Sequence, residues 1–441
     1  MKILVVVNLY PPHHAGTYEF RCQHVVESLR LRGHEVNVLT SNHGLKHEEI
    51  AENVWRRLLL NGVYGHPAVS GYNDLRPLEV HNHQVLNEAL SQFQPEVAYL
   101  WSQHGLSKSL MFGLQKARCP TVYDVADRWL SEELRKDPWL DWWNRAELPF
   151  PHGMLRGSLE LSGQRDALDK LAPTRHLKEI KRMPHLFGGY WGTDASAVMP
   201  FKLDYVYFCS NAFRKEALEA GLPVQQAEVI YPGIPARNYW SDVRPATTPV
   251  RRFLIYRRLH RDSGVGTAIK ALRIAREQDP SLTLNIYGDG DTGYIAQLRS
   301  LIAQSGGLPV EFRSVSDPAR DMPAVYRDHD AFLETAEWEE PFDTIHLEAM
   351  AAGLPIIGTI CGGTGETLQN DVNALTYTAG SAEELAAHML ALGRDPELRR
   401  RIASLGQEQV LHYFNESGII TRIEEILTAA KNGELTTGPT G

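Results

Sequence analysis

Ile3-Leu-Val-Val-Val7, the first apolar run of the chain, is followed by the turn Pro11-Pro-His-His-Ala-Gly-Thr17, a helical pattern ending at Arg32-Gly33, and the run Glu35-Val-Asn-Val-Leu39. A short, continuous run of apolar and β-branched residues is typical of a buried strand. Two such strands joined through a helix form a βαβ unit, whose right-handed crossover implies a parallel sheet. Further strands are predicted at residues 97–101, 121–123 and 205–209, so we expect an α/β domain over residues 1–244.

The same alternation of strands and helices starts again after a short segment rich in proline and threonine, Arg244-Pro-Ala-Thr-Thr-Pro249. Strands are predicted at residues 253–256, 282–287, 310–312, 331–333 and 355–358, which gives a second α/β domain over residues 250–415. A last helical run over residues 416–430 is a candidate to cross back to the first domain. Open α/β sheets bind ligands at the carboxyl ends of their strands, so two such domains predict a cleft lined by both sheets.

Some 80 residues separate the predicted strand at Thr121 from the one at Tyr205, and they contain an insertion into the first domain at about residues 128–200. Its tryptophans could line an acceptor site or a partner interface, or could pack the core of the insertion itself, and the sequence leaves both interpretations open. They are Trp129, Trp139, Trp142, Trp143 and Trp191.

The length and composition of the chain exclude several classes of protein. The 441 residues are too many for one ordinary domain, and 43% hydrophobic with 22% charged residues is typical of a soluble fold. A net charge of -9 argues against nucleic-acid binding. Four scattered cysteines, no signal peptide and no apolar run of about 18 residues predict a cytoplasmic protein without a spanning helix. Peripheral membrane contact and homo-oligomer formation stay open.

The most informative motif is Glu340-Pro-Phe-Asp-Thr-Ile-His-Leu-Glu348-Ala-Met-Ala-Ala-Gly-Leu-Pro355. Asp343 is a good N-cap, Gly353 suits the position after the helix and Pro355 prevents continuation, which predicts a helix over residues 344–352. Free N–H groups at a helix start favour a phosphate, and carboxylates accept hydrogen bonds from sugar and ribose hydroxyls. Alone, Glu340 and Glu348 would be interpreted as two solvated surface charges.

This motif resembles the E-x7-E motif of retaining glycosyltransferases of family 4. That family has the GT-B fold, an α/β fold of two Rossmann-like domains facing across a cleft. Other segments resemble family landmarks in the same order along nearly the whole chain. They are Pro11-Pro12 with Ala15-Gly16, Arg32-Gly-His-Glu-Val36, Ser210-Asn211, Tyr231-Pro-Gly-Ile234, Tyr287-Gly-Asp-Gly290 and Cys361-Gly-Gly-Thr-Gly-Glu366.

The resemblance implies roles for individual residues. Glu348 would bind the nucleotide ribose, Glu340 the hydroxyls of the donor sugar, and Arg258, on the arginine of the family's G-R-L motif, the donor diphosphate. Gly16 would let the backbone approach the donor phosphate or the acceptor. The remaining residues of the predicted donor site are Gly290, Phe342, Asp343, Thr344 and Glu366.

Three positions depart from the family pattern. Ser263-Gly264 stands where the family has Lys-Gly, so His260 or Arg261 would have to supply the second cation. Asp343 replaces a glycine, and its charge would lie near the donor phosphates unless it caps the helix. Ala126 replaces a histidine in Tyr123-Asp-Val-Ala-Asp127, which makes His104 the alternative for hydrogen bonding a donor-sugar hydroxyl or polarising the acceptor. We therefore expect the catalytic residues to be Glu340, Arg258 and His104, while Asp127 is either a cleft residue or a helix cap.

These expectations describe a retaining glycosyltransferase that needs no metal and no cofactor besides its nucleotide-sugar co-substrate. The base and the sugar of that donor cannot be read from the motifs. The acceptor would be a small molecule, a glycan or a lipid-linked molecule. Two alternatives stay open: a nucleotide-sugar 2-epimerase on the same scaffold, and a catalytically weak protein that binds a sugar nucleotide or serves as a scaffold.

Overall fold

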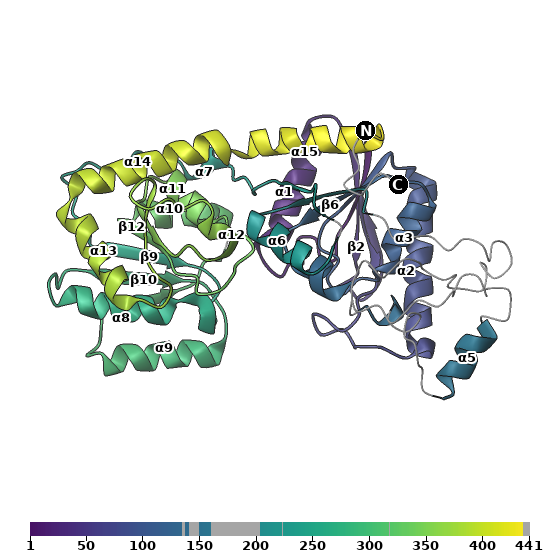
Figure 1. The fold of residues 1–441 in the computed structure, drawn as a ribbon, viewed down its shortest axis with the longest axis horizontal. Helices are drawn as coiled ribbons and strands as arrows, with labels where there is room; N and C mark the ends of the chain where they lie inside the picture. The colour runs from purple at the N-terminus through teal and green to yellow at the C-terminus, as the bar shows by residue number, and fades with distance from the viewer. Residues whose placement is uncertain (135–136, 141–149, 160–202, 223, 317, 435–441) are drawn as a thin grey trace. The chain divides into compact units, whose positions relative to one another are not determined.

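The computed structural model describes residues 1–134, 137–140, 150–159, 203–222, 224–316 and 318–434 (Figure 1). The chain divides into two compact units. Unit 1 comprises Met1–Cys209, Arg214–Val229 and Ile420–Gly441, and unit 2 comprises Ser210–Phe213 and Ile230–Ile419. The chain thus passes into unit 2 after Val229, and the predicted linker at residues 244–249 lies inside that unit. The last helix, α15 (Glu416–Lys431), belongs to unit 1 from Ile420 onward.

Unit 1 is built on an eight-stranded sheet with the strand order β3-β4-β2-β1-β5-β6-β7-β8. Every neighbouring pair is parallel except β3 and β4. The five expected strands of the first domain are present, and β3, β4 and β8 are additional. The strands are β1 (Lys2–Val6), β2 (Glu35–Ser41), β3 (Glu49–Ala51), β4 (Val54–Leu58), β5 (Val97–Leu100), β6 (Thr121–Val125), β7 (Tyr205–Phe208) and β8 (Glu228–Val229).

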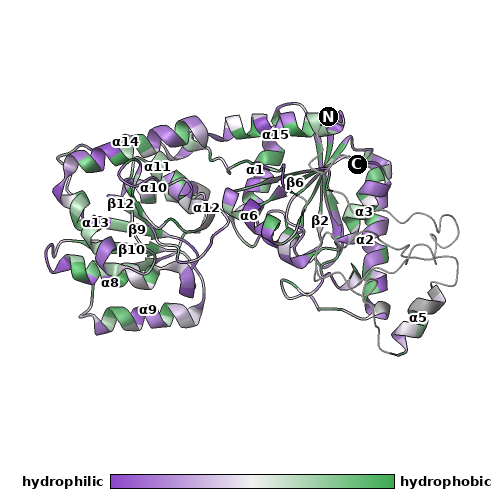
Figure 2. Ribbon diagram, viewed as in Figure 1, coloured by the Kyte–Doolittle hydropathy of each residue, from purple (hydrophilic) through white to green (hydrophobic). Residues whose placement is uncertain are grey.

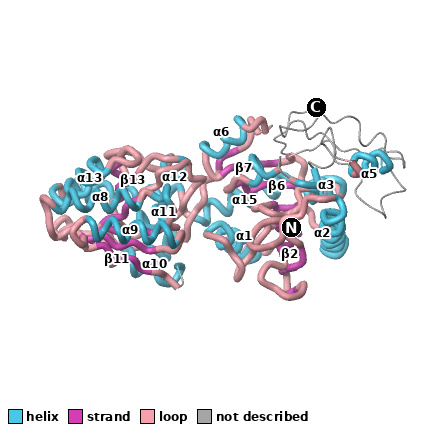
Figure 3. The backbone as a smooth tube through the Cα atoms, turned by 90° about the horizontal axis from the view of Figure 1, so that it is seen from below, coloured by secondary structure: helices cyan, strands magenta, loops and turns pink. Residues whose placement is uncertain are grey.

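Helices cover both faces of this sheet, with α1 on one side and α2 and α3 on the other (Figures 1 and 3). Helix α1 starts after Gly16, where the Glu19 carboxylate accepts hydrogen bonds from the N–H groups of Ala15 and Gly16 at 3.3 and 3.0 Å. The helices of this part of the chain are α1 (Thr17–Leu31), α2 (Tyr72–Phe93), α3 (Ser109–Lys116), the π-helical turn η1 (Trp129–Glu133), α5 (His152–Leu159) and α6 (Asn211–Glu219).

Unit 2 carries a six-stranded, fully parallel sheet with the order β11-β10-β9-β12-β13-β14. Its strands are β9 (Arg252–Tyr256), β10 (Thr283–Tyr287), β11 (Val310–Arg313), β12 (Ala331–Glu334), β13 (Ile356–Gly358) and β14 (Ala374–Thr376). Its helices are α7 (Ala236–Tyr239), η5 (Arg261–Ser263), α8 (Val265–Arg276), α9 (Thr292–Gln304), α10 (Pro318–Arg327), α11 (Ile345–Ala351), α12 (Gly362–Gly365), α13 (Ala382–Arg394) and α14 (Pro396–Tyr413).

Alternate residues of the central strand β9 pack on opposite faces of the sheet in unit 2. Phe253 and Ile255 lie in a core shared with α8 and α13, whereas Leu254 lies in a second core with α10 and α11. A sheet covered by helices on both faces needs strands that are apolar throughout. Figure 2 shows this pattern, with hydrophobic residues concentrated in the strands and hydrophilic residues on the outer faces of the helices.

Each sheet has one point at which the strand order reverses. In unit 1 it lies between β1 and β5, and in unit 2 between β9 and β12. At such a point the loops after the two strands diverge and leave a crevice at the carboxyl edge, where open α/β sheets bind their ligands. The loops that follow these four strands are therefore the places to look for functional side chains.

The turn between β9 and α8 depends on Gly264. Its φ is +69°, and a Cβ atom there would lie 1.7 Å from the carbonyl oxygen of Thr335. We predict that Gly264→Ala lowers the free energy of unfolding by more than about 1 kcal/mol, because it adds a steric clash to the cost of a left-handed residue. Gly266→Ala is the control, since its Cβ would meet nothing nearer than 3.8 Å inside α8. Urea denaturation should show only the first variant destabilised, and equal midpoints for both would contradict the assignment.

Candidate functional site

Arg257, the first residue after β9, is buried at the reversal point of unit 2. Its guanidinium forms an ion pair with Glu334, the last residue of β12, at 2.6 Å. It also bonds both carboxylate oxygens of Glu340 at 3.2 Å. One cation thus connects the ends of the two strands that flank the crevice, and it fixes the side chain of Glu340.

Arg258, the predicted diphosphate ligand, is placed differently from its neighbour. Its side chain is exposed, and within the described residues no hydrogen bond or ion pair holds its guanidinium. The two adjacent arginines therefore serve different purposes. The guanidinium of Arg257 forms ion pairs inside the protein, whereas the guanidinium of Arg258 remains available to an anionic ligand.

Two glycines hold the loop that carries Glu340. The N–H of Gly363 donates to the carbonyl oxygen of Glu340 at 2.7 Å, and the N–H of Gly362 donates to the carboxylate of Glu339 at 2.9 Å. A Cβ on Gly362 would lie 2.2 Å from the Glu340 carbonyl oxygen, and one on Gly363 1.9 Å from that of Pro341. The segment Cys361-Gly-Gly-Thr-Gly365 thus requires glycine so that its backbone can contact the acidic loop.

Helix α11 begins at Ile345, one residue later than expected. The Asp343 carboxylate accepts a hydrogen bond from the N–H of Ile345 at 3.1 Å, and the Asp343 N–H donates to the Thr364 hydroxyl at 2.8 Å. Asp343 therefore caps the helix, as the sequence suggested, and Thr344 occupies the N-cap position without a side-chain hydrogen bond. The carboxylate occupies part of the helix start that we had expected to receive an anionic ligand.

Glu348 lies on α11 among tyrosine hydroxyls. Its carboxyl group accepts a hydrogen bond from Tyr326 at 2.9 Å, and Tyr239 also bonds to it. Burial and, to a smaller extent, the charge of Asp343 together raise the pKa of Glu348 to about 8, against the hydrogen bonds from Tyr326 and Tyr239, which lower it. Burial likewise raises the pKa of Glu340, although Arg257 opposes that effect. With its proton held, the carboxyl group of Glu348 can both donate hydrogen bonds to hydroxyl groups and accept hydrogen bonds from them.

The other predicted donor-site residues contact the protein itself. Glu366 accepts hydrogen bonds from the N–H groups of Asn211 and Ala212 and from the Tyr231 hydroxyl, at 2.6–3.0 Å, so it caps α6. Phe342 packs against the ring of Tyr231, with the centroids 5.5 Å apart. Gly290 allows close chain packing, because a Cβ there would lie 2.0 Å from a carbonyl oxygen of the segment after β9. In unit 1, a Cβ on Gly16 would meet no atom within 4 Å, which leaves open space beside it.

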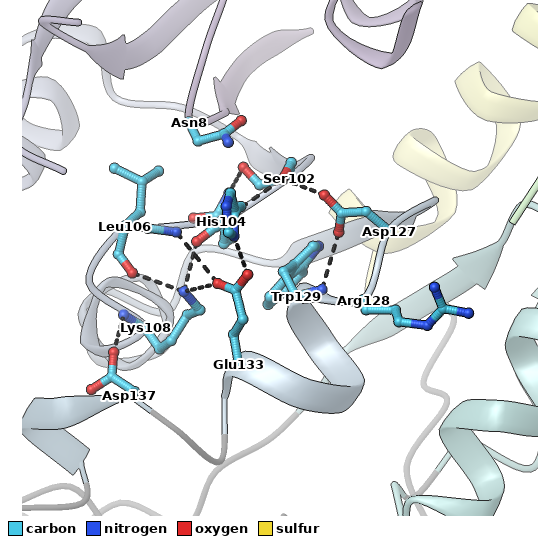
Figure 4. Close-up of polar contacts among 12 residues, drawn as sticks. Asn8, Ser102, His104, Leu106, Lys108, Asp127, Arg128, Trp129, Glu133 and Asp137 are labelled. Atoms are coloured by element: carbon cyan, nitrogen blue, oxygen red, sulfur yellow. Dashed lines mark hydrogen bonds and ion pairs between the residues drawn. The ribbon is translucent and has the colours of Figure 1, made fainter. Parts of the chain in front are cut away.

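The reversal point of unit 1 carries a second polar cluster (Figure 4). His104, in the loop after β5, bonds through Nδ1 to the carboxylate of Glu133 at the end of η1. The Lys108 ammonium donates to the same carboxylate at 3.1 Å. Beside them, the Ser102 hydroxyl donates to Asp127 at 2.5 Å, and the N–H of Trp129 donates to Asp127 at 3.2 Å. Asp127 thus caps the turn that follows, and burial raises its pKa to about 6.

The residues of these clusters that were not predicted from the sequence include Arg257, Glu334, Ser102, Lys108 and Glu133. Arg257 follows β9 directly and is adjacent to the predicted Arg258, but the sequence does not show which of the two is buried. Glu133 and Lys108 belong to no motif and lie 29 and 25 residues from their partners His104 and Glu133. Of the tryptophans in the insertion, Trp129 and Trp139 are buried core residues, whereas Trp142, Trp143 and Trp191 lie outside the described residues.

Residues 240–409 match the model of the family described as Glycosyl transferases group 1. This segment lies within unit 2 and contains Arg257, Arg258, Glu340 and Glu348. The match supports the expected family over this segment of the chain.

Relatives with known names support the same class. Glycogen synthase of Mycobacterium tuberculosis (strain CDC 1551 / Oshkosh) is 30% identical over 237 residues, which cover 52% of this chain and 55% of that protein. The amylovoran biosynthesis glycosyltransferase AmsK of Erwinia amylovora is 27% identical over 224 residues, or 49% of this chain and 54% of that protein. The matched segments thus span about half the length of these curated relatives.

A solved structure extends the likeness of the fold to both units. The Anabaena protein Alr3699/HepE in complex with UDP and glucose superposes with a TM-score of 0.63 at 20% identity, covering 97% of this chain and all of that one. The expected fold, two Rossmann-like units of the GT-B class, is confirmed.

The described ranges contain no group of three or more His, Cys, Asp or Glu side chains placed to hold a metal ion. None of the helices in those ranges combines the length and apolar composition needed to cross a membrane.

The raised pKa of Glu348 predicts a dependence of stability on pH. The folded protein holds this proton up to about pH 8, while the unfolded chain releases it near 4.5, so stability falls as the pH rises between these values. We predict that Glu348→Gln, which cannot ionise, gains stability over the wild type across this range, by up to about 1.4 kcal/mol for each pH unit between the two pKa values. Urea midpoints at pH 5, 6.5 and 8 measure the gain. The exposed Glu408→Gln should show none, and a pH-independent difference for Glu348→Gln would contradict the prediction.

Proposed function

We propose that this protein is a glycosyltransferase that moves a sugar from a nucleotide-sugar donor to an acceptor, with retention of configuration and without a metal ion. One observation carries the proposal. The segment that matches the group 1 glycosyl transferase family gathers Arg258, Glu340 and Glu348 around the reversal point of a parallel sheet. Retention rests on the resemblance of the pair Glu340 and Glu348 to the E-x7-E motif.

The geometry suggests how the donor is bound. The two bonds from Arg257 hold the Glu340 carboxylate, which has further lone pairs to accept hydrogen bonds from sugar hydroxyls. Glu348, which keeps its proton among tyrosines, would bind the ribose. With the donor bound in this way, the diphosphate would lie near the loop after β9, where Arg258 is exposed.

Arg258 would then act on the leaving group. As the bond between the sugar and the diphosphate stretches, negative charge develops on the phosphate oxygens. A guanidinium already in place stabilises that charge, and its planar donors suit phosphate oxygens. Because Ser263 is buried and occupies the place of the family's lysine, Arg258 would carry this task with less help than in other members of the family.

The donor and the acceptor are both to be found by experiment. The similar Anabaena protein was solved with UDP and glucose, so UDP is the first nucleotide to test. Products formed without an added acceptor would instead indicate a 2-epimerase. Donor binding without turnover would indicate a protein that only binds sugar nucleotides.

We predict that a nucleoside diphosphate raises the melting temperature of the wild type, because a ligand that binds the folded state stabilises it. Arg258→Ala should weaken this binding by roughly 10-fold to 100-fold, the range expected for losing one charge-assisted contact. Isothermal titration calorimetry measures the dissociation constants.

Arg251→Ala is the matched control, since it removes another exposed arginine from the segment that begins β9. It should bind the nucleotide as the wild type does. If both variants weaken binding equally, the effect reflects the overall charge of the surface. If no uridine, guanosine, adenosine or thymidine diphosphate binds the wild type, the proposed function is wrong.

A further inference from the structure

The polar cluster at the reversal point of unit 1 has no task in donor binding as described above. The cluster comprises Ser102, His104 and Lys108 from the loop after β5, and Asp127 and Glu133 from the segment after β6 (Figure 4). Both segments lie at the carboxyl edge of the sheet, where open α/β sheets bind their ligands.

Glu133 is fixed through both carboxylate oxygens. Oε1 bonds to Nδ1 of His104, while Oε2 accepts from the Lys108 ammonium at 3.1 Å and from the N–H of Gly105 at 3.3 Å. Lys108 is itself buried and donates two further hydrogen bonds, to the carbonyl oxygens of Gln103 at 2.7 Å and Leu106 at 3.0 Å. All three N–H groups of Lys108 are therefore used, and its charge holds that of Glu133 in place.

The imidazole of His104 is held in one orientation, but only one of its two ring nitrogens has a hydrogen-bond partner among the described residues. Because Nδ1 faces a carboxylate, it carries a proton, and the opposite nitrogen, Nε2, points away from Glu133. Within the described residues Nε2 has no hydrogen bond, and the side chain of His104 is 38% exposed. The ring of Tyr64 packs edge-on against the imidazole, with the centroids 5.5 Å apart, and limits its rotation.

The charges around the imidazole favour its protonated form. The hydrogen bond to Glu133 raises the pKa of His104, and the charges of Glu133 and Asp127 act in the same direction, while burial and Lys108 oppose it. Tyr64 is neutral, because burial raises its pKa. Two further buried carboxyl groups, those of Glu79 and Asp137, lie near the ammonium charge of Lys108.

The carboxylate of Glu133 is charged throughout the neutral range. Burial works to raise its pKa, but the bonds from His104 and Lys108 outweigh burial and lower the pKa to about 2. An imidazolium paired with this anion has one free N–H and is a stronger hydrogen-bond donor than a neutral group.

We propose that Glu133 and Lys108 are positioning residues that hold His104 as a protonated hydrogen-bond donor, whose Nε2–H binds an oxygen of the sugar substrate in the crevice of unit 1. The proposal rests on the proposed function and deepens it. It places a hydrogen-bond donor in unit 1, built from residues that belong to no recognised motif. His104 would not act as a general base in this arrangement, because a base must have no proton on Nε2 before the reaction.

Titration of His104 tests whether Glu133 holds the proton. Histidines carrying 13C at the ring give NMR signals that shift with pH, and His104→Asn identifies the signal of His104 among the 18 histidines of the full-length protein. We expect His104 to titrate above the ordinary value of 6.5 in the wild type and at least about one unit lower in Glu133→Gln. Glu133→Asp, which keeps the charge, should titrate between the two. Equal titration in all three proteins would overturn the proposal.

Activity over a range of pH tests whether the proton is used. Transfer by the wild type should decline as the pH rises through the titration of His104, and in Glu133→Gln this decline should shift to lower pH, with kcat about 10-fold lower at pH 7.5. Transfer that instead increases as His104 loses its proton would show a base and overturn the proposal. A rise in KM for the donor or for the acceptor shows which substrate carries the oxygen.

Glu132→Gln is the matched control. Glu132 precedes Glu133 on η1, but its side chain is 49% exposed and pairs with Arg128 at 3.7 Å. This variant should retain the wild-type titration of His104 and the wild-type pH profile. If no donor supports transfer, the proposed function fails, and the titration still decides whether Glu133 and Lys108 hold the proton on His104.

Discussion

The ion pair network of Arg257 is the constraint on which the candidate donor site depends. Its guanidinium lies between Glu334 at the end of β12 and Glu340 in the loop beyond, so it joins the two strands at which the sheet of unit 2 reverses. A buried charge is tolerated only when it is paired, and breaking such a pair costs about 3–5 kcal/mol. The energy that stabilises this edge of the sheet also positions Glu340. Stability and ligand recognition therefore use the same interaction.

Close backbone contacts complete the site. Gly264 brings the turn after β9 against Thr335, and Gly362 brings the following loop against Glu340. Neither approach leaves room for a Cβ atom, so these glycines serve packing between loops. The polar group at the crevice of unit 1 is built differently. There, the buried Lys108 anchors Glu133, and Glu133 orients His104. In each unit a buried charged side chain thus holds a second polar side chain in place.

Much of this could be predicted from the sequence, because local chemistry determines it. The apolar runs of β1 and β9 predict parallel strands, and Asp343 with Gly353 predicts the limits of α11 to within one residue. Interactions between distant residues could not be predicted. Nothing near Glu366 reveals that it caps α6, 155 residues away. Nor does the pair Arg257-Arg258 show which guanidinium is buried, because that depends on carboxylates 77 and 83 residues further along.

The central claim is that a nucleotide-sugar binds at the reversal point of unit 2 through Arg258, Glu340 and Glu348. A crystal structure of the protein grown with UDP, and a second with a uridine diphosphate sugar, tests it most directly. We predict diphosphate oxygens within about 3 Å of the Arg258 guanidinium, ribose hydroxyls at Glu348 and sugar hydroxyls at Glu340, the usual distances of charge-assisted hydrogen bonds. A nucleotide bound away from these three side chains, with Arg258 still directed into solvent, would contradict the account.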